Sequence, residues 1–164
     1  MKICLINDTH AGARGDSLLF NEFFFKFWEG TFFPYLKENN IKQIIHLGDV
    51  VDRRKYINYI ILNQWRKRFF DVLERENIQM DIIVGNHDVT YKNTNEINAM
   101  HELFNKYDNI NVYIEPVEKI YDENDLIKPY QIYQIFFCSI HCGKCYLGPF
   151  QILKFQNDQI LIQI

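Results

Sequence analysis

Short apolar runs rich in β-branched residues alternate along this chain with longer segments whose apolar positions follow a helical period. The short runs predict buried strands at residues 2–7, 42–47, 80–84 and 112–114. The longer segments predict helices at residues 16–39, 56–76 and 95–107. Because strands and helices alternate, the pattern predicts an α/β fold whose strands pair in parallel through right-handed crossovers.

Breaks in the pattern refine these expectations. Gly30 and Pro34 should bend or interrupt the first helix, and Asn93 and Glu96 have the spacing of a capping box for the third. Later in the chain, two apolar-rich segments without a helical period predict further strands, at residues 132–140 and 150–164. We therefore expect one domain over residues 1–164, with a βαβ core over 1–120 and a strand-rich tail over 121–164.

Composition narrows the class of protein. A chain of 164 residues with 48% hydrophobic content is long enough for one domain with a real core. The formal charge of −3 gives no overall basic field, so nucleic-acid binding would require a local basic patch. Four cysteines, three of them closely spaced, do not indicate a disulfide framework, and no apolar stretch approaches the ~18 residues of a membrane span. These features predict a reduced, cytoplasmic setting without a membrane.

Polar residues follow each of the first three predicted strands: Asp8 and His10, then Asp49, then Asn86. The carboxyl ends of parallel strands meet at one edge of a sheet, so these side chains should converge. In an extended segment Asp8 and His10 would face the same side, and the Asp49 carboxylate could bridge two ions. Carboxylate, imidazole and amide ligands suit Mn²⁺, Fe²⁺ or Zn²⁺. Two such ions would activate water and hold phosphoryl oxygens, which favours phosphoester hydrolysis.

Three motifs in this order and spacing resemble the first motifs of the calcineurin-like metallophosphoesterases: Asp8-x-His10, Gly48-Asp49-x-x-Asp52 and Gly85-Asn86-His87-Asp88. The stretches at 49–55 and 84–93 are similar to the DNA repair exonuclease subunit of the SbcD type, especially the phage recombination endonuclease subunit. This resemblance covers roughly the first 115 residues. It implies an α/β fold in which a sandwich of sheets is flanked by helices. It also implies a metal-dependent phosphodiesterase that cleaves DNA with a metal-activated water molecule.

The resemblance also implies residue roles. Asp8, His10 and Asp49 would hold a first divalent ion, and Asp49 with Asn86 a second. Mn²⁺ is the first choice, with Mg²⁺, Fe²⁺ and Zn²⁺ as alternatives. His87 would act as the acid or stabilise the transition state. Asp88 would join it as a catalytic residue that could orient the His87 imidazole, and Asp52 would support the ligands from behind.

The sequence departs from the family beyond residue 120. His141, which follows a strand-like run, could supply the ligand that the family places on a later strand. The final Gly-His-x-His, the capping domain and the helical segment that binds the ATPase partner do not occur in the sequence. A truncated or divergent copy of a phage gene would have this pattern, and we then expect weak activity or none.

Further residues are candidates for contacts with DNA. Arg53, Arg54 and Lys55 follow the second loop and could hold a DNA backbone, although a solvated charge run explains them nearly as well. Tyr91 and Lys92 follow the third loop and fit a phosphate-backbone groove. The partners implied by the resemblance are DNA and an ATPase subunit of the SbcC type, and the chain could also form a homodimer. A phage-encoded protein would work in the host cytoplasm.

Several residues have a structural interpretation beside a functional one. His46 lies inside a predicted strand, which favours a core histidine whose polar atoms are satisfied. His101 lies in a predicted helix away from the strand ends, which favours a surface position. The aromatic cluster at 23–28 could stack on bases, but a helix that covers a sheet explains it more simply. A zinc site in the tail would have all four ligands within a stretch of eight residues, which does not match the usual spacing of two ligand pairs. Its candidate ligands are Cys138, His141, Cys142 and Cys145.

Two other functions compete with the DNA nuclease. The same three motifs permit a metallophosphatase that acts on small molecules or phosphoproteins. The missing final histidines permit an inactive remnant that binds DNA or a partner without turnover. Metal-dependent hydrolysis of any phosphodiester would exclude the remnant.

Overall fold

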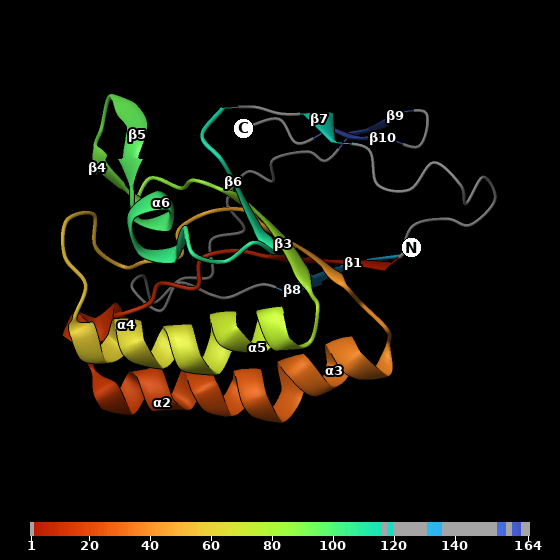
Figure 1. Cartoon of the computed structure of the whole chain (residues 1–164), viewed down its shortest axis with the longest axis horizontal. Coiled ribbons are helices and arrows are strands. Elements are labelled where there is room, and N and C mark those ends of the chain that lie inside the picture. Colours follow the sequence, from red (N-terminus) through yellow and green to blue (C-terminus); the bar gives the residue numbers. More distant parts are fainter. Residues whose placement is uncertain (1, 116–117, 120–130, 136–153, 157–158, 162–164) are drawn as a thin grey trace, which may run out of the picture.

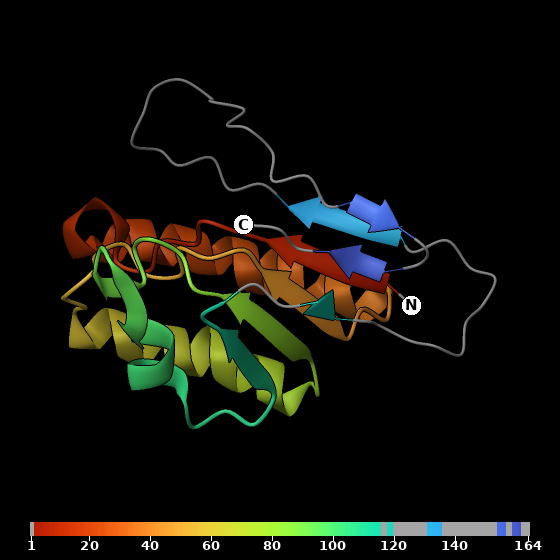
Figure 2. The same ribbon diagram turned by 90° about the horizontal axis from the view of Figure 1, so that it is seen from above.

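A parallel sheet of five strands is the centre of the fold. The computed structural model describes residues 2–115, 118–119, 131–135, 154–156 and 159–161. In spatial order the sheet is β6-β3-β2-β1-β8, with every neighbouring pair parallel (Figure 2). Its strands are β1 Lys2–Ile6, β2 Gln43–His46, β3 Gln79–Ile83, β6 Ile110–Tyr113 and β8 Gln131–Ile135. The first four predicted strands are confirmed, with ends that shift by one or two residues.

Two long helical segments lie side by side against one face of the sheet (Figure 1). The first consists of α2 Leu18–Phe27, η1 Trp28–Phe32 and α3 Phe33–Glu38, and a short turn, α1 Ala13–Asp16, precedes it. The second consists of α4 Tyr59–Trp65, η2 Arg66–Phe70 and α5 Asp71–Arg75. Each segment has a π-helical turn, η1 or η2, at its middle. The expected irregularity near Gly30 and Pro34 is confirmed, because Gly30 lies within η1 and Pro34 in the first turn of α3.

Large aromatic side chains fill the space between these helices. Trp28 and Phe32 of η1 and Phe69 of η2 are fully buried, as is Trp65 of α4. The Trp28 ring packs edge-on against Phe32 at 4.8 Å and against Phe69 at 4.9 Å between ring centroids. Such pairs add to the free energy gained by burying the rings. Trp28 of the aromatic cluster at 23–28 is therefore part of the core and not a platform for bases.

The third predicted helix, over residues 95–107, is confirmed only over its middle part. Residues 89–98 form a hairpin of β4 Val89–Tyr91 and β5 Thr94–Asn98, and the helix, α6, is only Ala99–Phe104. Asn98 caps α6 by accepting a hydrogen bond from the His101 N–H at 2.9 Å, so the proposed capping box does not form. The segment contains β-branched and aromatic residues around a polar two-residue turn, a pattern typical of hairpins.

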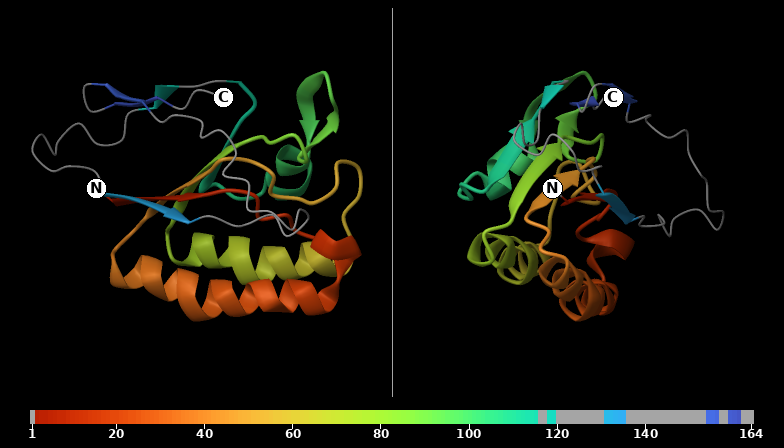
Figure 3. Two further views of the ribbon diagram at one scale, coloured as in Figure 1. Left: turned by 180° about the vertical axis from the view of Figure 1, so that it is seen from behind. Right: turned by 90° about the vertical axis from the view of Figure 1, so that its right-hand side faces the viewer.

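The later strands belong to two different sheets. β8 comes from the predicted segment 132–140 and joins the main sheet beside β1. β9 Lys154–Gln156 and β10 Gln159–Leu161 form a small antiparallel sheet with β7 Glu118–Lys119. This small sheet lies on the side of the main sheet away from the helices (Figure 3). The division into a core over 1–120 and a tail over 121–164 stays a prediction, although β8 of the tail pairs with β1.

Candidate metal centre

The loops that follow β1 and β2 run side by side at the carboxyl edge of the sheet. The Leu47 N–H donates to the Ile6 carbonyl at 2.8 Å, and the Asp8 N–H to the Gly48 carbonyl at 3.1 Å. The His10 N–H then donates to the Asp49 carbonyl at 3.1 Å. Parallel pairing therefore continues past the ends of both strands. The main chain itself fixes the position of the first loop relative to the second.

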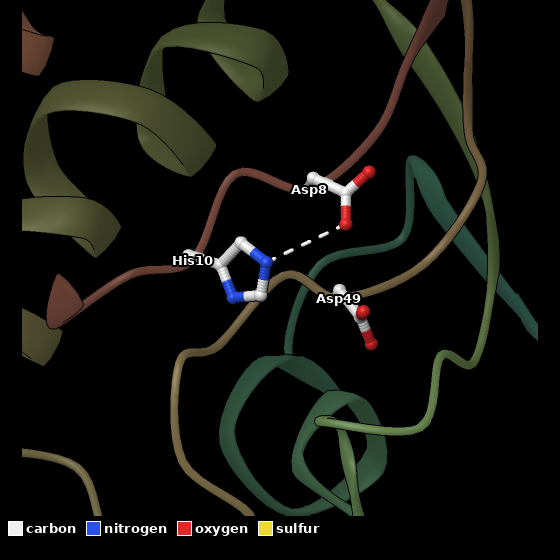
Figure 4. A group of neighbouring side chains, drawn as sticks. All are labelled: Asp8, His10 and Asp49. Carbon is white, nitrogen blue, oxygen red and sulfur yellow. Dashed lines mark ion pairs between the residues drawn. The ribbon is translucent and has the colours of Figure 1, made fainter. Parts of the chain in front are cut away.

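Asp8, His10 and Asp49 come together at this edge (Figure 4). One potential ligand atom from each lies within 4.8 Å of the others. His10 Nε2 is 3.4 Å from Asp8 Oδ1, and all three residues are half-buried. Burial of His10 disfavours its charged form, but the Asp8 carboxylate and the charges of Asp49 and Asp52 outweigh this and raise its pKa. A group with this concentration of negative charge around one imidazole is suited to a cation.

The three residues converge by a route that differs from the expected one. Asp8, His10 and Asp49 have φ angles of 52°, 42° and 56°, in the left-handed region. The expectation that Asp8 and His10 share a side because their segment is extended is therefore wrong. Tight turns bring them together, and aspartate and histidine tolerate these turns better than most residues. Thr9 does point away, since its buried hydroxyl contacts the His46 ring at 3.0 Å.

Asp52 lies on the other side of the His10 ring from Asp8. The buried Nδ1 of His10 has no hydrogen bond but faces Asp52 Oδ1 at 3.6 Å. The opposite ring nitrogen, Nε2, faces Asp8. Histidine ligands of metals commonly present one ring nitrogen to the ion and donate the other N–H to a carboxylate. The orphaned Nδ1 and the mixed donor set therefore fit a divalent cation held by Asp8, His10 and Asp49.

Two glycines let the loop after β3 approach the loop after β2. A Cβ atom on Gly48, whose φ is 99°, would lie 2.7 Å from Gly85 Cα. A Cβ atom on Gly85 would collide with the backbone nitrogen and the carboxylate of Asp49. With no side chains in the way, the His87 N–H donates to Asp49 Oδ1 at 2.8 Å. The third loop is thus bonded directly to a candidate ligand.

The His87 ring lines the same site. Its centroid is 4.9 Å from that of His10, with the rings nearly perpendicular. His87 Nδ1 lies 2.6 Å from the Asp52 carbonyl oxygen, and because a carbonyl only accepts, Nδ1 must carry the proton. This contact fixes the tautomer and leaves Nε2 free of that bond. The geometry suits proton donation from Nε2, or charge stabilisation, when the ring is protonated.

Asp88 has a different position from the one expected. Its two carboxylate oxygens accept the backbone N–H groups of Val51 and Gly85, each at 3.0 Å. The side chain is fully buried, and burial raises its pKa to about 6 against the opposing effect of these hydrogen bonds. The hypothesis that Asp88 orients the His87 imidazole is corrected, because the Asp52 carbonyl does so. Asp88 instead ties the second and third loops together.

The comparisons with known proteins agree with this geometry. The sequence model of the family described as calcineurin-like phosphoesterase matches residues 1–155. The chain belongs to the calcineurin-like phosphoesterase family. The match extends well beyond the 115 residues over which the motifs and neighbouring stretches resemble that family. It also confirms the α/β fold class expected from the sequence.

A curated relative of this phosphoesterase is exonuclease subunit 1 of Enterobacteria phage T4. The two are 33% identical over 122 residues, which is 74% of this chain and 35% of the phage protein. The matched part thus spans about a third of the relative's length. Among the residues that the structure describes, no helix of the phosphoesterase is both long and apolar enough to cross a membrane.

Those remaining predicted residues that the structure describes lie in the segments that follow β2 and β3. Asn86 is exposed in the loop between Gly85 and His87. Arg53 forms an ion pair with Asp16, a partner that the sequence did not suggest and that only the fold brings near. The predicted DNA contacts are exposed except for half-buried Arg54: Arg53, Lys55, Tyr91 and Lys92. His141, Cys138, Cys142 and Cys145 lie outside the described residues.

The two histidines with structural interpretations are where the sequence placed them. His46 is 2% exposed, and His101 is exposed on α6. His46 Nδ1 accepts the Gly48 N–H at 3.1 Å, so Nε2 carries the proton and donates to Thr9. Burial lowers the pKa of His46 to about 3. His46 is thus a satisfied core residue that contacts both the loop after β1 and the loop after β2.

Proposed function

We propose that this chain is a metal-dependent phosphodiesterase that acts on DNA. The observation that carries the proposal is the convergence of Asp8, His10 and Asp49 within 4.8 Å, with the His87 ring beside them. Family membership supports phosphoester hydrolysis, and the similarity to a phage exonuclease subunit supports DNA as the substrate. We assign Mn²⁺ to the site because its ligands are carboxylate and imidazole.

The residue roles in this proposal combine the described positions with the resemblance to the family. Asp8, His10 and Asp49 would hold the first ion. Asp49 and Asn86 would hold the second, with His141, which lies outside the described residues, as a further ligand. Bound divalent ions supply Lewis acidity that activates water and neutralises charge on the phosphoryl oxygens. The His87 imidazole, held at Nδ1 by the Asp52 carbonyl, donates a proton from Nε2 or stabilises the developing charge.

The wider assignments belong to the same proposal. Arg53, Arg54 and Lys55, with Tyr91 and Lys92, contact DNA beside the metal centre. The relative's name, which calls it a subunit, supports work within a complex. We extend this to an ATPase subunit of the SbcC type, a role in DNA recombination and repair, and a place in the host cytoplasm. Exposed Leu19 and Phe23 on α2 support a homodimer, which light scattering of the wild-type chain and of Phe23→Glu would test.

The test compares phosphodiester with phosphomonoester hydrolysis. In the presence of Mn²⁺, the purified chain should cleave single-stranded DNA and methyl p-nitrophenyl phosphate, a diester without a base. It should act much more slowly on the monoester p-nitrophenyl phosphate. A preference for the monoester would favour the metallophosphatase, and no Mn²⁺-dependent hydrolysis of any diester would overturn the proposal in favour of an inactive remnant.

Two variants separate metal binding from catalysis. Asp49→Ala should abolish both tight Mn²⁺ binding in calorimetry and cleavage. His87→Gln should leave Mn²⁺ binding within about twofold but lower the rate of cleavage by ~100-fold or more, which is typical of losing a general acid. Asp108→Ala, which removes an exposed aspartate between α6 and β6, is the control and should change neither. Undiminished cleavage by His87→Gln would show that the role of His87 is misassigned.

A further inference from the structure

Tyr91 is an exposed aromatic residue next to the metal centre. It is the last residue of β4, pairs with Thr94 across the hairpin turn, and is 51% exposed. The Lys55 ammonium lies 5.9 Å from the centroid of the Tyr91 ring, which is within cation–π range. A cation therefore stands against the ring while about half of the side chain remains open to solvent.

The hairpin that carries Tyr91 is anchored at its base. Asp88, just before β4, bonds the backbone of Val51 and Gly85 through its buried carboxylate. The Asp88 carbonyl accepts the Ala99 N–H at 2.7 Å, which closes the hairpin, and Val89 is buried. These contacts attach the base of the hairpin to both ligand-bearing loops. The position of Tyr91 is thus set relative to the metal centre.

The chain also fixes how far Tyr91 lies from the reacting groups. The segment 52–55 and the segment 87–91 both start at the contact between the Asp52 carbonyl and His87, and they meet again at Lys55 and Tyr91. Four residues of extended chain span at most ~14 Å, so the Tyr91 backbone lies no farther than this from that of His87. Nucleotides follow one another every 3.4 Å along a strand of duplex, so this distance corresponds to only a few nucleotides.

We propose that Lys55 and Tyr91 form a subsite that stacks one unpaired base of a DNA strand a few nucleotides or fewer from the phosphate that is cleaved. This inference rests on the proposed function and names its substrate as single-stranded or frayed DNA. An aromatic side chain stacks on the face of any base, and each such stack strengthens binding by about 5-fold to 150-fold. A base inside a duplex already stacks on its neighbours, so only an unpaired base reaches the ring without a further energetic cost.

Lys55 has two functions in this subsite. Its ammonium lies close enough to the Tyr91 ring for a cation–π contact, and it can neutralise a neighbouring phosphate. The subsite therefore combines a sequence-tolerant contact to a base with a contact to the backbone. It predicts little discrimination between bases but strong discrimination against a nucleotide that lacks its base.

The test first measures binding without catalysis. A single-stranded oligonucleotide with 2-aminopurine at one position is titrated with protein in the absence of added divalent ions. We expect the fluorescence of the wild-type complex to be quenched by stacking at one position, and Tyr91→Phe to behave like wild type. Tyr91→Leu should lose the quenching and bind at least fivefold more weakly. The control Tyr59→Leu removes an equally large side chain, 85% exposed at the start of α4, and should have no effect.

The second arm measures hydrolysis with Mn²⁺. Tyr91→Leu should raise KM at least fivefold on single-stranded DNA, with little change in kcat, whereas the control Tyr59→Leu should change neither. An abasic nucleotide at the quenched position should weaken wild-type binding by the same factor and should not weaken Tyr91→Leu further. Equal losses on the intact and abasic strands, or no position-dependent quenching, would overturn the inference and leave the Lys55–Tyr91 contact as a brace for the hairpin. Absence of all diester hydrolysis would overturn the proposed function alone, because the fluorescence arm needs no turnover.

Discussion

Single residues in this protein combine ligand chemistry with backbone conformation. Asp8, His10 and Asp49 carry the potential ligand atoms of the candidate metal centre and also adopt positive φ angles, which most side chains avoid. Such conformations each cost about 1–3 kcal/mol and persist only where surrounding contacts enforce them. Here the enforcing contacts are the backbone hydrogen bonds between the first and second loops. Asp52 makes two contacts in the site, because its side-chain carboxylate faces His10 while its main-chain carbonyl accepts a hydrogen bond from His87.

This double contact gives a prediction for Asp52→Asn. The substitution removes the charge that faces His10 but keeps the main-chain carbonyl that holds His87. We expect Mn²⁺ affinity, measured by calorimetry, to fall about 10- to 100-fold, as is usual when a residue behind a ligand is lost. Asp108→Asn is the matched control on an exposed aspartate and should bind Mn²⁺ normally. Unchanged affinity in Asp52→Asn would mean that Asp52 does not support His10.

His46 gives a prediction about pH. Its folded pKa of about 3 lies below its ordinary 6.5, because burial disfavours the charged form of the ring. The unfolded chain therefore binds more protons than the folded chain between pH 6.5 and pH 3, and stability falls as the pH is lowered through this window. Below pH 6, His46 should lower the free energy of unfolding by an amount that approaches about 1.4 kcal/mol for each unit of pH.

Urea denaturation at pH 7, 6 and 5 would measure this dependence. In His46→Gln the free energy of unfolding should depend less on pH over this range, even though the variant is less stable at pH 7. Comparing the slopes of the two proteins cancels the contributions of other titrating groups, including His10, whose pKa shifts in the opposite direction. Equal slopes would show that His46 is not held neutral in the folded protein.

At the scale of elements, the site depends on how closely three strand-end loops approach one another. Gly48 and Gly85 meet where the second and third loops cross, and a Cβ atom on either would contact the backbone of the other loop. The buried Asp88 carboxylate bonds both loops from the interior. The hairpin of β4 and β5 begins at the same point, so one local arrangement positions Asp49, His87 and Tyr91.

Gly85→Ala tests the importance of this approach. The added methyl group would collide with the backbone and carboxylate of Asp49, so the loops must separate. We expect the free energy of unfolding to fall by roughly 1–3 kcal/mol, as for overpacking, and Mn²⁺ affinity to fall with it. In the control, Gly30→Ala, nothing lies within 4 Å of the added Cβ, and stability should rise by up to about 1 kcal/mol from helix propensity. Gly85→Ala with wild-type stability and metal binding would contradict the proposed contact.

At the scale of the whole molecule, both helical segments support one face of the sheet while the carboxyl edge carries the candidate metal centre. The aromatic layer of Trp28, Phe32, Trp65 and Phe69 joins these segments to each other. The folded chain can therefore hold the ligand-bearing loops close together, whereas the unfolded chain cannot. An ion that binds the assembled site should consequently stabilise the entire fold.

We predict this stabilisation for Mn²⁺. At a free concentration one hundred times its Kd, the ion should raise the free energy of unfolding by about 2.7 kcal/mol. For a chain of this size, that corresponds to a rise in Tm of very roughly 5–10 °C. Differential scanning calorimetry with Mn²⁺ and with EDTA would measure it, and Asp49→Ala should show no rise. A rise of the same size in Asp49→Ala would place the stabilising ion elsewhere.

The sequence alone determined the features that depend on local pattern. Burial of β1, β2 and β3 appears as apolar runs, and the residues that follow these runs must lie at the carboxyl edge of a parallel sheet. This was enough to expect Asp8, His10 and Asp49 together at that edge. It also identified His46 as a core residue, because a histidine within a buried strand must have its polar atoms satisfied.

Only the tertiary structure decided the features that depend on residues far apart in the chain. Asp52 and His87 are separated by 35 positions, and Asp88 and Val51 by 37, so no local pattern indicated that a carbonyl holds His87 or that Asp88 bonds backbone amides. Residues 95–98 were expected at the start of a helix, but the bond from the Ala99 N–H to the Asp88 carbonyl closes segment 89–98 as a hairpin, and Asn98 caps the helix that follows. The left-handed turns at the ligands likewise follow from hydrogen bonds between neighbouring loops, which exist only once the strands have paired.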